Sequence, residues 1–266
     1  MRSLANCLIA GTALLLSAAG QATDIQSETV TYPAGDQDME GFIAYDADVE
    51  GERPAVLVVH EWWGMTEHAR DRARALAEAG YTAMAIDMYG EGRTAEHPED
   101  AGEMAAAVRE NMDRMTRRFN AGLELIRQHD TVDSDHVAAI GYCFGGGVVL
   151  EMARNGADLD AVASFHGSLA TDDPAEPGDV QAPLLILHGE ADQMVSEAEV
   201  DAFRKEMVAA DAYFRLISYP DAMHSFTNPQ ADDYAEEFDL PVGYNEEAAT
   251  KSWRELLGFL EQHLGG

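Results

Sequence analysis

The stretch that decides the fold reads Val137-Ala-Ala-Ile-Gly-Tyr-Cys143-Phe-Gly-Gly-Gly-Val-Val-Leu-Glu-Met-Ala153. Its first four residues are apolar and predict a strand, and the residues from Val148 onward predict a helix. Glycines surround Cys143 between them, which is typical of a sharp strand-to-helix turn that holds a nucleophile in a strained backbone. The free N–H groups at the helix start favour a thiolate there. We therefore predict that Cys143 is a nucleophile.

Two other interpretations of this turn remain open from the stretch alone. Cys143 could be a buried structural residue in a glycine-rich turn. A phosphate-binding loop fits less well, because no Lys-Ser or Lys-Thr pair follows the glycines as such a loop requires. The choice depends on whether the rest of the chain supplies a general base and a residue that orients it.

The 266-residue chain is strongly acidic, with 49 Asp and Glu against 17 Lys and Arg and a formal net charge of -32. This charge disfavours nucleic acid and anionic membranes as partners. Because the acidic residues are spread along the chain, they indicate a surface adapted to high external salt, which would screen the self-repulsion. The hydrophobic fraction of 46% suffices for a sizeable core. We predict a single domain over residues 23–266, with no obligate protein partner evident.

Residues 1–22 differ in composition from the rest of the chain. Arg2 gives a positive start, an apolar segment runs to Leu16, and small residues lead to Ala22. This pattern predicts a signal peptide cleaved near Ala22, so that the protein is exported, periplasmic or secreted, and free of the membrane after cleavage. Retention of the segment as an anchor is the alternative. Cleavage would remove Cys7 and leave Cys143 as the only thiol, so no intramolecular disulfide is expected.

Strand-like and helix-like segments alternate along the rest of the chain. Strands are predicted at 29–32 and 41–45, which form an edge hairpin, and at 54–60, 81–88, 137–140, 160–165, 184–188 and 214–219. Helices are predicted at 69–79, from 148 onward, at 197–209 and at 248–264, and one long helical region covers 99–129. This alternation predicts an α/β fold with a mostly parallel central sheet, helices on both faces, and ligands bound beyond the C-terminal ends of the strands.

Asp192 and His224 each follow a predicted strand, at the edge of the sheet where ligands are expected. The order of nucleophile, acid and histidine along the chain is that of an α/β-hydrolase with such a turn. We therefore predict a triad in which His224 takes the proton of the Cys143 thiol and Asp192 orients His224. Glu190 and Asp221 remain alternatives for the acid, although Asp192 falls at the expected position in its loop.

Four segments together resemble the dienelactone hydrolase family of cysteine α/β-hydrolases over nearly the whole mature chain. They are Gly141-Tyr-Cys143-Phe-Gly145, Gly189-Glu-Ala-Asp192, His224-Ser-Phe226 and Glu61-Trp-Trp-Gly64. The resemblance implies an α/β-hydrolase fold and a role for Glu61, which would interact with the resting thiol and shift on substrate binding to help form the thiolate. From the sequence alone, Glu61 could equally be a solvated loop carboxylate. The oxyanion hole would use the backbone N–H groups of Phe144 and Trp62.

The chain departs from the family at two substrate-binding positions. Family members that act on chlorocatechol products place arginines where this chain has Glu91 and Asn228. Arg93 could replace them in part, or it could be a solvated loop residue. Because an acidic protein without these cations is poorly suited to an anionic lactone, we do not expect dienelactone itself to be the substrate. An aromatic and largely neutral pocket is expected instead, from residues that could each also be core packing: Trp62, Trp63, Tyr89, Tyr142, His166 and Phe226.

These observations predict a hydrolase that cleaves a small carboxylic ester or lactone through a Cys143 acyl-enzyme. No cofactor or metal is expected, because the histidines lack ligand spacing and no dinucleotide-binding fingerprint follows a first strand. A thioesterase, acyltransferase or peptidase with the same triad is the main alternative. The lack of a resolving Cys disfavours a thiol redox protein, and the complete triad disfavours a non-catalytic binding protein on the same fold.

Overall fold

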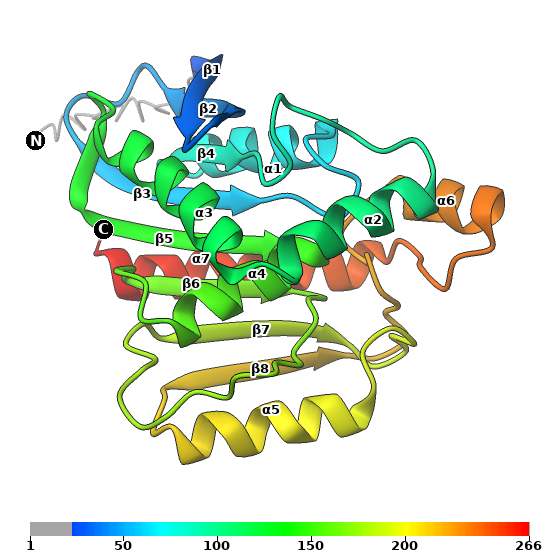
Figure 1. The fold of residues 1–266 in the computed structure, drawn as a ribbon. Helices are drawn as coiled ribbons and strands as arrows, with labels where there is room; N and C mark the ends of the chain where they lie inside the picture. The colour runs from blue at the N-terminus through cyan, green and yellow to red at the C-terminus, as the bar shows by residue number, and fades with distance from the viewer. Residues whose placement is uncertain (1–22, 266) are drawn as a thin grey trace, which may run out of the picture.

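The computed structural model describes residues 23–265, so the predicted signal peptide lies outside the described residues. Eight strands form one sheet in the order β1-β2-β4-β3-β5-β6-β7-β8 (Figure 1). The strands are β1 (Ile25–Ala34), β2 (Gln37–Asp46), β3 (Arg53–Val59), β4 (Thr82–Ile86), β5 (Val132–Tyr142), β6 (Ala161–Phe165), β7 (Leu184–Gly189) and β8 (Phe214–Tyr219). The helices are α1 (Glu67–Glu78), α2 (Pro98–Arg109), α3 (Met112–Arg127), α4 (Phe144–Arg154), α5 (Glu197–Ala209), α6 (Ala231–Phe238) and α7 (Glu246–Leu264).

The sheet is mostly parallel, as the alternating strands and helices predicted. β3 pairs in parallel with β4 and β5, and the parallel pairing continues through β6, β7 and β8. β1 and β2 form the predicted antiparallel hairpin at the edge, and β2 pairs antiparallel with β4. The α/β fold class is therefore confirmed, and the C-terminal ends of β3 to β8 lie at one edge of the sheet.

Apolar side chains are buried on both faces of the sheet, because the parallel strands are apolar on both sides. On one face the strands pack against α3, α4 and α5, with Phe119, Val149 and Phe203 in the core. On the other face they pack against α1 and α7, through residues such as Leu76 and Leu256. Within the described residues, no helix combines the length and the apolar character needed to cross a bilayer.

The prediction of one long helical region over 99–129 is wrong, because the chain breaks it into α2 and α3. Asn111 is the N-cap of α3, where its side-chain Oδ1 accepts a hydrogen bond of 2.8 Å from the Arg114 N–H. Such a cap satisfies an N–H group that has no partner inside the helix, and so starts a new helix at that point. Apolar residues continue at spacings of three and four across the break. The helical periodicity therefore could not reveal that one helix ends and another begins there.

Helix α6 was not predicted from the sequence. It is short and highly charged, and Ala231 is its only buried residue. Its aromatic side chains pack instead on the loop after β3, since the ring of Tyr234 stacks on that of Trp63 with centroids 4.4 Å apart. The contact places α6 beside the C-terminal ends of the strands, at the right in Figure 1.

Candidate active site

Cys143 lies at the sharp turn between β5 and α4, in the strained conformation that the surrounding glycines predicted. Its φ of 52° and ψ of -113° are unusual for a residue with a side chain. A Cβ atom on Gly145 would collide with the Val59 carbonyl of β3, and one on Gly141 would collide with the Gly145 carbonyl. The absence of side chains at both positions therefore allows α4 to start directly against the sheet and to lift Cys143 out of it.

Asp192 and His224 meet across the ends of β7 and β8. His224 donates a hydrogen bond of 2.9 Å from Nδ1 to Oδ2 of Asp192. The other Asp192 oxygen accepts from the N–H groups of Met194 and Val195. Burial alone would raise the pKa of Asp192, but its hydrogen bond to His224 and the two backbone N–H groups lower it below the ordinary value. Asp192 is therefore a fixed carboxylate that holds the His224 ring.

The alternatives for the acid point elsewhere. Glu190 and Asp221 are both exposed, whereas the side chain of Asp192 is fully buried. The geometry therefore brings together the predicted acid and histidine.

The far nitrogen of His224 faces the nucleophile. Its Nε2 atom is buried and has no hydrogen-bond partner among the described residues. Burial disfavours the charged ring, but its interactions with Cys143 and its hydrogen bond to Asp192 together raise the pKa of His224. An imidazole with one nitrogen fixed and the other unpaired next to a thiol is arranged to exchange a proton with it.

Glu61 is buried between the loop after β3 and the loop after β8. It is only 2% exposed, and it accepts hydrogen bonds of 2.9 Å from the Ser225 hydroxyl and 2.6 Å from the Asn228 side-chain amide. Nδ1 of His68 lies 3.7 Å from the same carboxylate. No hydrogen bond joins Glu61 to Cys143 in the described part of the chain. Ser225 and His68 were not predicted from the sequence as partners of Glu61.

The predicted oxyanion donors lie on two segments that touch. The Gly145 N–H donates to the His60 carbonyl over 3.1 Å, which fixes the start of α4 against the loop that carries Trp62. The hydroxyl of Tyr89 donates to the Trp62 carbonyl over 2.9 Å and holds the same loop from the other side. Among residues 23–265, neither the Trp62 nor the Phe144 N–H donates to another backbone group. Both are therefore available to an oxyanion.

His166 was predicted to line the pocket. In the structure it is buried and forms a hydrogen bond with the turn that carries Cys143. Its Nδ1 accepts a hydrogen bond of 3.2 Å from the Cys143 N–H. Nε2 must then carry the proton, and it donates to the Thr227 hydroxyl over 2.8 Å. Burial, reinforced by the neighbouring His224 and His68, holds the pKa of His166 well below its ordinary value. A neutral His166 thus links the turn to the loop after His224, and Thr227 is a partner that the sequence did not indicate.

The other residues predicted to line the pocket are largely buried. Phe226 is 0% exposed and packs edge-on against His166, and Tyr142 stacks on Phe165. Trp63 lies against Tyr234 of α6, as described above, and its ring also meets that of Trp62 edge-on. Of these aromatic side chains, those that stay partly exposed are Trp62, on the loop after β3, and Tyr234, on α6.

Arg93 is held by backbone carbonyls of its own loop. Its guanidinium donates to the Tyr89 carbonyl and, over 3.2 Å, to the Gly90 carbonyl. Glu91 is exposed, with a positive φ of 58°. Asn228, at the second family position, is occupied with Glu61.

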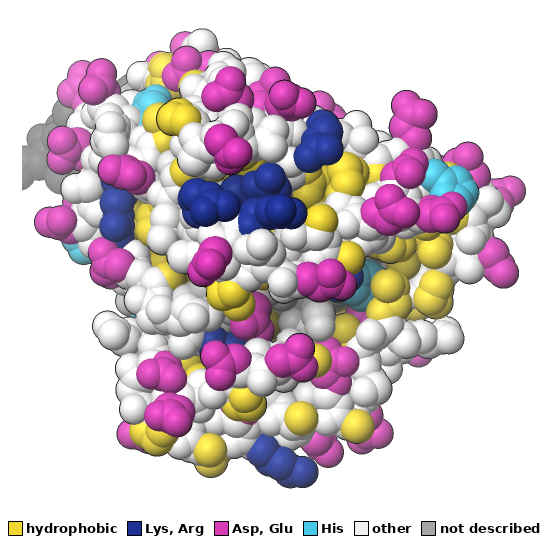
Figure 2. Space-filling model, viewed as in Figure 1, with side chains coloured by type: hydrophobic (Ala, Val, Ile, Leu, Met, Phe, Trp, Pro, Cys, Tyr) yellow, Lys and Arg dark blue, Asp and Glu magenta, His cyan; other side chains and the backbone are white. Residues whose placement is uncertain are grey.

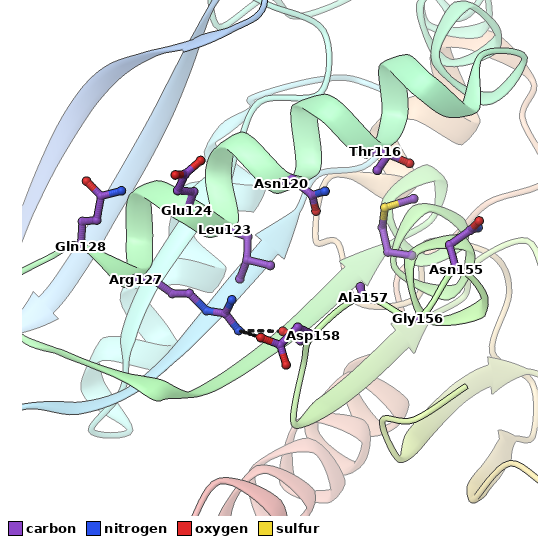
Figure 3. Close-up of a pocket in the computed structure, with 11 residues that line it drawn as sticks. Thr116, Asn120, Leu123, Glu124, Arg127, Gln128, Asn155, Gly156, Ala157 and Asp158 are labelled. Atoms are coloured by element: carbon purple, nitrogen blue, oxygen red, sulfur yellow. Dashed lines mark hydrogen bonds and ion pairs between the residues drawn. The ribbon is translucent and has the colours of Figure 1, made fainter. Parts of the chain in front are cut away.

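A separate groove lies between α3 and the loop that follows α4 (Figure 3). It is about 560 Å³ in volume, and an ion pair of 2.9 Å between Arg127 and Asp158 crosses its wall. None of the predicted site residues lines it. Within residues 23–265, no group of three or more His, Cys, Asp or Glu side chains has the geometry to hold a metal ion.

Comparison with known proteins gives a consistent result. Residues 39–264 match the sequence profile of the dienelactone hydrolase family. A Salmonella typhimurium protein provisionally named carboxymethylenebutenolidase is 27% identical over 250 residues, which cover 91% of this chain and 89% of that protein. A solved dienelactone hydrolase-like promiscuous phosphotriesterase from metagenomic libraries has a TM-score of 0.84 at 31% identity, covering 91% of this chain and 99% of the other. The Pyrococcus horikoshii acylaminoacyl peptidase shares the fold alone. It has 14% identity and a TM-score of 0.66, and the match covers 92% of this chain and 42% of that one.

Proposed function

The chain belongs to the dienelactone hydrolase family and is a hydrolase, and from this premise we propose that it cleaves a small carboxylic ester or lactone through a Cys143 acyl-enzyme. The observation that carries the proposal is the hydrogen bond from His224 to Asp192, together with the unpaired Nε2 of His224 beside the thiol. This arrangement supplies a nucleophile, a base and a residue that orients the base.

The reaction would proceed in two halves. In the first, Cys143 gives its proton to Nε2 of His224 and its sulfur attacks the ester carbonyl. The N–H groups of Trp62 and Phe144 stabilise the oxyanion, and the alcohol leaves with the proton from His224. In the second half, His224 takes a proton from water, the hydroxide attacks the thioester, and the carboxylic acid leaves as Cys143 is restored.

We propose a neutral substrate in preference to dienelactone itself. The two positions that hold cations in relatives acting on chlorocatechol products carry Glu91 and Asn228 here. Asn228 is a neutral amide already bonded to Glu61. The partly exposed rings of Trp62 and Tyr234 pack on the buried Trp63, and rings of this kind suit an aryl or alkyl group.

Turnover of a neutral aryl acetate tests the mechanism. The test uses a Cys7→Ala variant, because Cys143 is then the only thiol and an alkylating reagent modifies one position. We expect turnover that is lost in proportion to alkylation. Unimpaired turnover after complete modification would exclude Cys143 as the nucleophile.

A substrate panel separates this function from its rivals. It contains the aryl acetate, a neutral lactone, a thioester, a blocked dipeptide and a carboxylate-bearing lactone, and also a phosphotriester because of the named activity of the metagenomic relative. The proposal expects the highest kcat/KM for the neutral ester or lactone. Preference for the thioester or the peptide would favour the alternatives, and no turnover of any compound would favour a binding protein.

We also propose that residues 1–22 are a cleaved export signal. Their apolar segment and small-residue end support this, as does a single remaining thiol that avoids unwanted disulfides. The test is N-terminal sequencing of the protein recovered from the periplasm or the medium. A protein that retains Met1 and stays in the cytoplasm would contradict the proposal.

A further inference from the structure

Four arginines gather on this acidic protein, and we name them the arginine cluster: Arg93, Arg114, Arg117 and Arg118. They come from the loop after β4 and from the first half of α3. Figure 2 shows Lys and Arg side chains concentrated over the part of this face that α3 occupies in Figure 1, whereas acidic side chains are scattered across the remainder of it. With 49 acidic against 17 basic residues in the chain, such a concentration requires an explanation.

The cluster is not neutralised by carboxylates. Among residues 23–265, ion pairs join seven Lys and Arg side chains to acids, and none of the seven belongs to the cluster: Arg70, Arg74, Arg127, Arg154, Arg204, Arg215 and Lys251. The groove in Figure 3 provides the contrast, because Arg127 in its wall is paired with Asp158.

Backbone carbonyls hold the guanidinium groups in place. Arg118 donates to the Met88 carbonyl over 2.6 Å, and Arg114 donates to the Ala107 carbonyl over 2.9 Å. Arg93 donates to carbonyls of its own loop. A guanidinium group has five N–H donors, so each arginine keeps donors that these bonds do not use. Arg93, Arg114 and Arg118 are therefore held in position while donors remain for a ligand.

Holding these cations together costs free energy, and Asp87 offsets this cost only in part. Burial lowers the pKa of Arg118, and the charges of Arg114, Arg93 and Arg117 lower it further, while Asp87 acts against them. Asp87 is already engaged, since its two oxygens accept from four backbone N–H groups. An anion between the arginines would relieve this repulsion.

A cavity is present at this place. It is about 230 Å³ in volume and is lined by Tyr89 and three cluster arginines, with apolar side chains of α2 and the carboxylate of Glu103. We propose that this cavity binds a small oxyanion, namely phosphate, sulfate or an organic carboxylate, through Arg93, Arg114 and Arg118. Glu103 limits the occupant, because it would repel a large or highly charged anion. The site goes beyond the proposed function, since its arginines have no part in the triad.

Titration calorimetry with inorganic phosphate tests the site, with sodium chloride used to keep the ionic strength constant. We expect saturable binding to the full chain. Arg114→Gln should weaken it about tenfold or more, since a charge-assisted contact is lost. Arg114→Lys should retain part of the affinity. Arg204→Gln is the matched control, because it removes one positive charge from the distant α5 and should leave phosphate binding unchanged.

The outcomes separate the site from general electrostatics and from misfolding. The proposal would be overturned if titration with phosphate gave no more heat than titration with chloride. It would also be overturned if Arg114→Gln and Arg204→Gln lost phosphate affinity equally. The melting temperature of each variant without phosphate reports on folding, and Arg114 is only half-buried, so its replacement should be tolerated. Because binding is measured without a substrate, failure of this test leaves the proposed hydrolysis intact.

Kinetics with the unmodified protein identify the source of the anion. Competition of phosphate with an ester bearing a remote carboxylate, but not with a neutral ester, would assign the site to a substrate's acidic group. Competition with neither ester would assign it to a free ion. If phosphate competed equally with both esters, and competed just as strongly in Arg114→Gln, phosphate would bind at the catalytic centre. That result would contradict the proposed site.

Discussion

The side-chain amide of Asn228 donates a hydrogen bond of 2.6 Å to Oε2 of Glu61. Both side chains are only 2% exposed. A buried carboxylate needs partners, and here a neutral amide and the Ser225 hydroxyl supply them. Asn228 and Ser225 thus satisfy Glu61 and join the loop after β8 to the loop after β3.

Asn228→Ala should therefore destabilise the protein by about 1–3 kcal/mol, since it leaves one oxygen of the buried Glu61 carboxylate without that donor. Urea unfolding at neutral pH measures the change. Asn120→Ala is the matched control, because Asn120 is exposed on α3 and its replacement should cost little. An equal effect of the two substitutions would mean that the bond to Glu61 contributes nothing to stability.

Gly145→Ala should disrupt the turn that carries Cys143. The new Cβ would collide with the Val59 carbonyl, which belongs to the rigid sheet and cannot move aside. We expect a loss of about 1–3 kcal/mol in the free energy of unfolding, together with a fall in kcat as the nucleophile shifts. Gly147→Ala is the control, since its Cβ would have ordinary contacts of 3.5 Å or more. If the two variants unfold alike, close packing of the turn is not the reason for these glycines.

Much of the fold could be predicted because its signals are local and strong. Apolar runs marked the parallel strands, and the strands at 214–219 and the helix at 197–209 match β8 and α5 in their bounds. The break at Asn111 was missed because apolar spacing continues across it, and the single polar side chain that caps α3 gives a weak signal. Helix α6 was missed because it buries almost nothing and so lacks an apolar stripe.

Residues of the candidate site could be predicted where their order along the chain is informative. Contacts that arise only from packing of distant segments could not be predicted. Cys143, Asp192 and His224 follow a fixed order at strand ends, which is why the sequence could propose them as a triad. The structure joins Asp192 to His224 by a hydrogen bond, and the catalytic role of the three residues stays a proposal. The contacts of Thr227 with His166, and of Ser225 with Glu61, join segments more than 60 residues apart, and these hydroxyls look like any others in the sequence. The arginine cluster is likewise formed only when the loop after β4 meets α3.

The pKa of His224 should be measurably raised, and NMR titration of its ring can test this. Although burial opposes the charge, the Cys143 sulfur and Asp192 raise the value above 6.5. Cys143→Ala should lower the pKa of His224, because the interactions of the ring with Cys143 are removed. Because the pKa of His224 is higher in the folded protein than in the unfolded chain, protonation of His224 stabilises the fold. This stabilisation is fully present below the unfolded-state pKa of 6.5 and is lost as the pH rises through the folded-state pKa. No difference between the wild type and Cys143→Ala would show that the two groups do not interact.

Asp192→Asn should reduce kcat for a neutral ester by roughly 10³- to 10⁴-fold, in line with the effect of the same change in other triads. The amide cannot accept the Nδ1 proton of His224 as a carboxylate does, so the proton can move to Nε2 and leave no base facing Cys143. Glu190→Gln and Asp221→Asn remove the same charge from exposed positions in the same two loops, and both should retain nearly full activity. Equal losses in all three variants would point to loop electrostatics, whereas a selective loss in Glu190→Gln would transfer the orienting role to that residue. Substrate KM should change little in Asp192→Asn, because Asp192 lies behind His224 and is arranged to act through the ring.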